Sequence, residues 1–141
     1  MRSELLLIAF FFLMISCKDE CKDLRGNEIN EMLIINADKN QINYCSLYTK
    51  AKEGNIEAIR KISLLNFEDS SGYEHGIILI DLIEYTGEKK YISALSTITI
   101  EEKRRLFAYL DVGLQYTDNT KFKEKELKNV FPTLSVFLSK I

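Results

Sequence analysis

The sequence predicts an all-α protein of about six short helices that pack as antiparallel pairs. Apolar residues recur at helical spacing along most of the 141-residue chain, and this period is the main signal of amphipathic helices. The chain contains one proline, which argues against a fold rich in loops. Short polar turns separate the apolar stripes, and short connections favour antiparallel neighbouring helices.

Glycine and asparagine mark the ends of the first helices. The stripe that begins at Gln41 stops at Gly54, a residue type that commonly ends helices. Asn55 then offers a side chain suited to cap the next helix. Before Gln41, residues 28–35 are either a short helix or an extended lead-in, and residues 36–40 form a turn.

Two capping boxes define the middle of the chain. Ser71 stands three residues before Glu74, and Thr99 stands three residues before Glu102, each just ahead of an apolar run. This spacing predicts a helix start. The first of these runs is apolar on more than one face, so we expect it to be the central buried helix. Its β-branched residues leave a strand as the alternative.

The last helices follow turns at Gly87, at residues 118–120 and at Pro132, which fits the first position of a helix. Residues 87–95 also echo residues 54–62 at an offset of 33 residues. That spacing resembles the period of helical-repeat arrays and implies a HEAT-like stack. The predicted helices are 41–53, 55–65, 73–85, 88–96, 100–115, 121–130 and 133–140.

The N-terminal residues have the pattern of a secretion signal. A basic Arg2 precedes an unbroken apolar segment from Leu5 to Ile15, and Ser16 and Cys17 follow it. Eleven helical residues reach about 16 Å, whereas a bilayer core is about 30 Å thick. The segment is therefore too short for a comfortable membrane span. A buried helix, or an ordinary cleaved signal with an incidental Cys17, is the alternative.

Residues 13–17, Leu-Met-Ile-Ser-Cys, resemble the lipobox of bacterial lipoproteins. The resemblance implies cleavage before Cys17 and lipidation of its sulfur and new amino group, which would anchor the chain to a membrane of the cell envelope. In a Gram-negative cell this would be the outer membrane, with the domain facing the periplasm or the surface. The chain then divides into a signal peptide (1–16), a lipidated cysteine with a polar tether (17–27) and one helical domain (28–141).

Two further cysteines, Cys21 and Cys45, would then lie outside the reducing cytosol. A disulfide between them would close a loop of about 25 residues and add about 3 kcal/mol. In the alternative, Cys45 is a small core residue that shares a helical face with Ile42 and Tyr48, and Cys21 is a free thiol. No second Cys or His lies at the spacing of a metal site.

Residues that point to catalysis are scarce. The one histidine, His75, has Glu74 and Asp81 nearby, which suggests an acid–base or metal site. We favour instead an exposed or half-buried helix residue. The acidic pairs 68–69 and 101–102 fit the favourable position of acids at helix N-termini. No catalytic, cofactor-binding or metal-binding residue is therefore predicted.

The composition suggests a protein-binding role. The net charge is −2, with acids and bases interspersed, so the basic stripe of a nucleic-acid binder is missing. The seven tyrosines either fill the core with their hydroxyls in solvent or form an interface. An envelope location makes cytosolic cofactors such as ATP improbable ligands.

Three functions follow in order of preference. The first is a non-enzymatic, lipid-anchored module that binds another envelope or secreted protein. The second is an immunity protein that binds and inhibits a secreted toxin. The chain is similar in size and helical character to small all-α envelope immunity proteins, including the amidase-immunity family of type VI secretion, although no motif carries the resemblance. The third is an enzyme of unrecognised chemistry.

Overall fold

The computed structural model describes residues 21–140, and the regular secondary structure in this range is helical apart from one isolated bridge between Lys22 and Glu28. The predicted all-α class is confirmed. The predicted signal peptide (1–16) and the predicted lipidation site, Cys17, lie outside the described residues. The helices are α2 (Glu31–Lys39), α3 (Tyr44–Lys52), α4 (Ile56–Ser63), α5 (Asp69–Thr86), α6 (Glu88–Ala94), α7 (Ile100–Tyr116), α8 (Leu127–Val130) and α9 (Pro132–Ser139).

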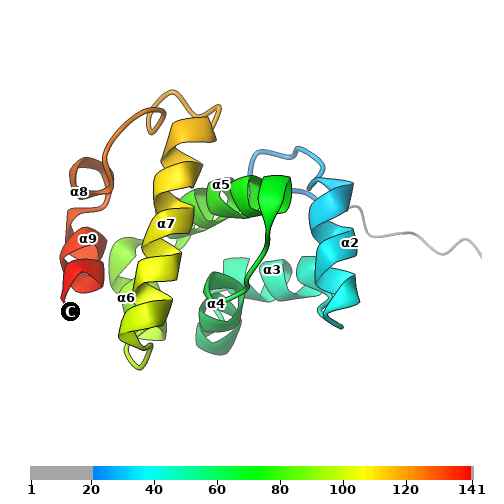
Figure 1. Cartoon of the computed structure of the whole chain (residues 1–141), viewed down its shortest axis with the longest axis horizontal. Helices are drawn as coiled ribbons and strands as arrows, with labels where there is room; N and C mark the ends of the chain where they lie inside the picture. Colours follow the sequence, from blue (N-terminus) through cyan, green and yellow to red (C-terminus); the bar gives the residue numbers. More distant parts are fainter. Residues whose placement is uncertain (1–20, 141) are drawn as a thin grey trace, which may run out of the picture.

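Helix α5 is central, as its apolar sequence predicts. It packs against α7, α2, α3 and α6, and α7 crosses it at a steep angle (Figure 1). Helices α2 and α3 lie toward one end of the long axis, and α8 and α9 lie at the other (Figure 1). The core is continuous across these helices. Its largest fully buried aliphatic side chains on α5 are Ile78, Leu79, Ile80, Leu82 and Ile83.

Side-chain caps fix the starts of α2, α3, α4 and α7. Asn30, Asn43 and Asn55 each accept a hydrogen bond from the backbone N–H two or three residues later. Thr99 and Glu102 form the predicted capping box, with both reciprocal hydrogen bonds in place. Each such cap satisfies backbone donors that would otherwise lack a partner.

Two predictions near the start of the domain are wrong. Residues 36–40 do not form a separate turn, because α2 continues to Lys39 and buries Leu33 and Ala37, four residues apart, on one face. Ser71 does not cap the central helix, which already begins at Asp69. The Ser71 hydroxyl instead accepts a hydrogen bond from the Asn36 side chain at 2.7 Å, so it joins α5 to α2.

The predicted helix over residues 121–130 is also wrong. Residues 120–124 form turns, Glu124 has a positive φ of 59°, and only Leu127–Val130 is helical. Phe122 and Leu127 are both buried in the core. The helical pattern of charges is overridden because both apolar side chains reach the core only when the segment bends.

The predicted sequence echo has a structural counterpart at its glycines. Gly54 and Gly87 have φ angles of 85° and 82°, and each precedes a short helix, α4 and α6 respectively. Positive φ angles favour glycine because it has no Cβ. Helices α4 and α6 also pack against each other. Each echoed segment therefore begins at a glycine with a positive φ angle just before one of two neighbouring short helices.

Candidate functional site

Helices α5 and α7 approach each other closely where two glycines face one another. A Cβ atom on Gly76 would overlap the Tyr109 carbonyl oxygen, and a Cβ on Gly113 would overlap the Gly76 carbonyl oxygen. Glycine permits such backbone-to-backbone contact because it has no side chain. The spacing of Gly72 and Gly76 and the position of Gly113 in an apolar stripe were signals of this crossing that the sequence analysis missed.

An apolar cleft of about 220 Å³ opens beside this crossing. Tyr73 from α5 and Tyr116 from α7 stack with their ring centroids 5.1 Å apart and their planes 12° apart. Both rings are half-exposed, at 49% and 56%. The cleft is lined by Phe67, Asp69, Gly72, Tyr73, Arg105, Ala108, Tyr109 and Val112. We call this feature, together with Tyr116, the α5–α7 cleft.

Tyr109 fixes the inner wall of the α5–α7 cleft. Its hydroxyl accepts a hydrogen bond from the Phe67 backbone N–H at 2.7 Å. The same hydroxyl donates toward two oxygen atoms, the Phe67 carbonyl oxygen at 2.8 Å and the Asn66 side-chain oxygen at 3.0 Å. These bonds hold the segment before α5 against α7. Hydrogen bonds of Tyr109 therefore hold the inner wall of the cleft in place.

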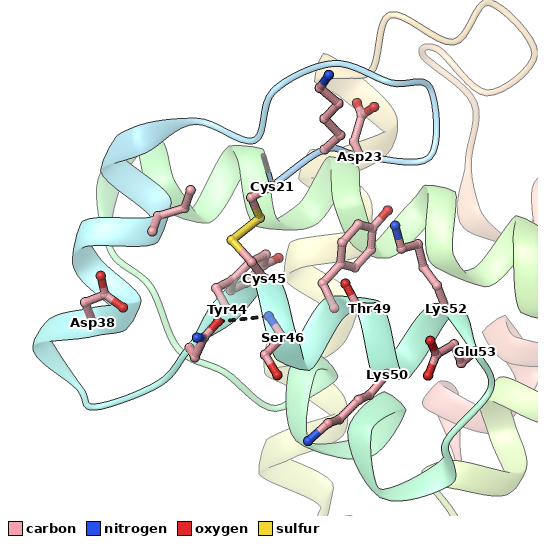
Figure 2. A pocket seen from close by; sticks show the side chains of 14 residues that line it. Cys21, Asp23, Asp38, Tyr44, Cys45, Ser46, Thr49, Lys50, Lys52 and Glu53 are labelled. Atoms are coloured by element: carbon pink, nitrogen blue, oxygen red, sulfur yellow. Dashed lines mark hydrogen bonds between the residues drawn. A yellow bond between two sulfur atoms is a disulfide. The ribbon is translucent and has the colours of Figure 1, made fainter. Parts of the chain in front are cut away.

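A second hollow, of about 720 Å³, lies over α3 and beside residues 21–23 (Figure 2). The sulfur atoms of Cys21 and Cys45 are bonded there, and their Cα atoms are 5.4 Å apart. The predicted disulfide pair is therefore brought together in the structure. The hollow also carries three lysines and three acids: Lys22, Lys50, Lys52, Asp23, Asp38 and Glu53.

The prediction that His75 is exposed or half-buried is wrong, because its side chain is fully buried. Its Nδ1 lies 2.8 Å from the Tyr44 hydroxyl, and the rings of Tyr44, Phe67 and Tyr109 surround it edge-on. Burial lowers the pKa of His75 from 6.5 to about 3. The imidazole is therefore neutral over the physiological range.

The acids next to His75 in sequence do not form a catalytic group with it. Asp81 pairs with Arg25 at 3.2 Å. Burial raises the Asp81 pKa to about 6, and Arg25 opposes part of this rise. The Nδ1 atom of His75 is hydrogen-bonded instead to the Tyr44 hydroxyl. Within residues 21–140, no group of three or more His, Cys, Asp or Glu side chains is arranged to hold a metal ion.

The other predicted roles have mixed outcomes. Glu102 is a helix-cap acid, and the hydrogen bond from the Thr99 backbone lowers its pKa. The tyrosine hydroxyls do not all reach solvent, because Tyr44, Tyr48 and Tyr91 are fully buried. The Tyr91 hydroxyl meets Ser63 at 2.6 Å in the interior. Among the described residues, no helix has the length and apolar character needed to cross a bilayer.

The comparisons with known proteins add no relative to this picture. No protein-family model, curated protein or solved structure matches the chain.

Proposed function

We propose that this protein is a lipid-anchored protein of the bacterial cell envelope that binds another protein through the α5–α7 cleft. The observation that carries the binding role is the stacked, half-exposed pair of Tyr73 and Tyr116 beside an apolar cleft. The anchoring role rests on the lipobox that ends at Cys17. The N-terminal segment thus anchors the protein to the membrane, and the cleft binds the partner.

The size and chemistry of the cleft favour a protein side chain as its occupant. Small-molecule and cofactor sites usually measure 300–1,000 Å³, and this cleft has about 220 Å³. Tyrosines that are held rigid are common among residues that dominate protein interfaces, because they bury a large area at little entropic cost. The partner therefore inserts one aromatic or long aliphatic side chain between Tyr73 and Val112.

Charges at the edge of the cleft set a second requirement on the partner. Arg105 from α7 and Asp69 from α5 both line it and are exposed. Opposite charges at a rim mainly govern the orientation of approach and the rate of association. The partner is expected to place an acid and a base on the two sides of its inserted side chain.

Site-specific photocrosslinking tests the binding role. A photoreactive phenylalanine analogue is placed at Tyr73 or, as a matched control, at Tyr85, which is 64% exposed near the other end of the same helix. We expect a discrete crosslinked protein from position 73 and none from position 85. Mass spectrometry identifies that protein, and a secreted toxin would make this an immunity protein.

Direct binding to the captured partner then tests the role of the stacked pair. Replacing Tyr116 with Ala is expected to weaken binding about tenfold or more, as for other interface hot spots. Tyr85→Ala is expected to leave binding unchanged. Equal binding by the Tyr116→Ala protein would contradict the proposal that the cleft is the interface.

Metabolic labelling tests the anchor separately. Cells that express the full chain receive a fatty-acid analogue, and we expect label on the wild-type protein and none on Cys17→Ala. The Cys17→Ala protein should also leave the membrane fraction. Unchanged labelling and membrane attachment in this variant would overturn the anchor without touching the binding proposal.

A further inference from the structure

The disulfide lies very close in sequence to the proposed lipid-bearing residue. Cys17 precedes Cys21 by four residues, and Cys21 is covalently fixed to Cys45 on α3. Only residues 18–20 therefore separate the lipid from a rigid part of the domain. At no more than about 3.6 Å per residue, four steps reach about 14 Å at full extension.

Without the disulfide, the covalent tether would be much longer. The first helix of the domain begins at Glu31, fourteen residues after Cys17, so the chain between them extends to about 50 Å. Non-covalent contacts also hold this segment, including the Arg25–Asp81 ion pair and the hydrogen bond from the Ile29 N–H to the Cys21 carbonyl at 2.9 Å. The disulfide makes the short tether permanent.

We infer that the Cys21–Cys45 bond holds the α2–α3 end of the domain against the bilayer that carries the lipid, so that the α8–α9 end points away from it. This inference rests on the lipid anchor of the proposed function. A domain of this size is about 35 Å across, which exceeds the reach of the short tether. The domain therefore cannot turn its far end to the membrane without displacing the anchored end.

The arrangement of the helices shows which end of the domain points away from the membrane. Helix α5 packs against both α3 and α7, while α3 bears the disulfide and α7 bears one wall of the cleft. The α5–α7 cleft lies between the two ends, because the ring of Phe67 in its wall is 6.0 Å from the ring of Tyr44, which lines the hollow over α3. Helix α9 lies at the opposite end of the long axis from α2 (Figure 1). The α8–α9 end of the domain is thus the end that points away from the lipid.

Electrostatic attraction to lipid does not explain this orientation. The charges of the three lysines and three acids that line the hollow beside the disulfide cancel (Figure 2). Adsorption to anionic membranes needs a cluster of basic residues instead. The short tether alone sets the orientation. We therefore expect the same orientation in zwitterionic vesicles and in vesicles that contain anionic lipid.

Energy transfer to the membrane surface tests the inference. The full-length lipidated protein is purified from bacterial membranes and reconstituted into phosphatidylcholine vesicles with an acceptor dye on the headgroups. A donor dye is attached through an unnatural amino acid at Thr49, which is exposed beside the disulfide, or at Val136, which is 55% exposed on α9. We expect transfer from position 49 to exceed transfer from position 136 by about twofold or more, because the tether is shorter than the domain.

A tether insertion provides the matched variant. Ten Gly and Ser residues between Glu20 and Cys21 add about 35 Å of reach and leave the disulfide intact, so we expect the difference between the two positions to vanish. The same insertion between Lys125 and Glu126, both exposed, should leave it unchanged. A paired Cys21→Ser and Cys45→Ser variant should reduce the difference, and circular dichroism checks that this variant is folded.

The outcomes separate the inference from the anchor. If the wild-type protein does not float with vesicles, the lipid anchor fails. If it floats but positions 49 and 136 transfer energy equally, or the tether insertion changes nothing, the anchor stands and the orientation is overturned. An unchanged difference in a folded protein that lacks the disulfide would overturn the role of that bond.

Discussion

Helix α5 packs in two contrasting ways on its two sides. Toward α7 it presents glycine, so that backbone meets backbone at Gly76 and Gly113. Toward α3 it presents His75, whose ring meets the Tyr44 hydroxyl and a group of aromatic rings. On the glycine side an added Cβ atom would overlap the facing backbone, and on the aromatic side the fully buried imidazole is enclosed by rings. One helix is therefore sensitive to size on one side and to protonation on the other.

The largest expected effect is the loss of stability that acid causes on the aromatic side of α5. The folded-state pKa of His75 is about 3, below the ordinary value of 6.5, so the unfolded chain binds the proton more readily. This contribution to stability is fully present above pH 6.5 and is lost as the pH falls toward 3. His75 alone is expected to contribute a loss of about 4 kcal/mol over that range, measured by comparing the pH dependence of the unfolding free energy with that of a variant that cannot protonate at this position.

A His75→Phe variant isolates this effect. Asp81 acts with the opposite sign, because its raised pKa of about 6 gives stability below pH 3.8 that is lost as the pH rises through 6. The variant keeps Asp81 and cannot protonate at position 75. We expect its stability to fall much less from pH 6.5 to 3 than that of the wild type. Parallel curves for the two proteins would show that His75 is not the acid-sensitive group.

An intermediate loss of stability is expected when a side chain is added on the glycine side of α5. A Gly76→Ala substitution forces α5 and α7 apart, because the new Cβ meets the backbone of Tyr109 and Gly113. Overpacking of this kind costs 1–3 kcal/mol or more, and the better helix propensity of Ala returns about 1 kcal/mol. We expect a net loss of about 2 kcal/mol in the free energy of unfolding at pH 7.

Gly72→Ala is the graded control for that substitution. Its Cβ would lie 3.2 Å from a Tyr109 ring carbon and 3.3 Å from the Phe67 carbonyl oxygen, contacts that a small shift relieves. We expect a change near zero, since helix propensity offsets the crowding. If both variants lose the same stability, the close crossing at Gly76 is not what limits the packing.

The two sides also differ in how far the sequence predicts them. Periodicity identifies α5 as central, and the spacing of Thr99 and Glu102 locates the start of α7, because both signals are local. The contacts of His75 and Ser71 depend on residues more than 30 positions away, so no local pattern reveals them. The α5–α7 cleft is missed for the same reason, since Tyr73 and Tyr116 meet only after the helices cross.

The smallest expected effect lies at the wall of the cleft, where Tyr109 joins the two sides. Its ring contacts His75, and its hydroxyl receives the Phe67 N–H. A Tyr109→Phe substitution keeps the ring and removes the hydroxyl, at a cost of about 1 kcal/mol, which is modest because the Phe67 N–H is only part-buried. Denaturant unfolding at pH 7 measures it, with Tyr85→Phe as the exposed control.

Since the aromatic enclosure of His75 remains, the acid sensitivity should persist in the Tyr109→Phe protein. Loss of that sensitivity would instead show that the bonds of the Tyr109 hydroxyl to Phe67 and Asn66 are needed to keep the aromatic enclosure closed around His75.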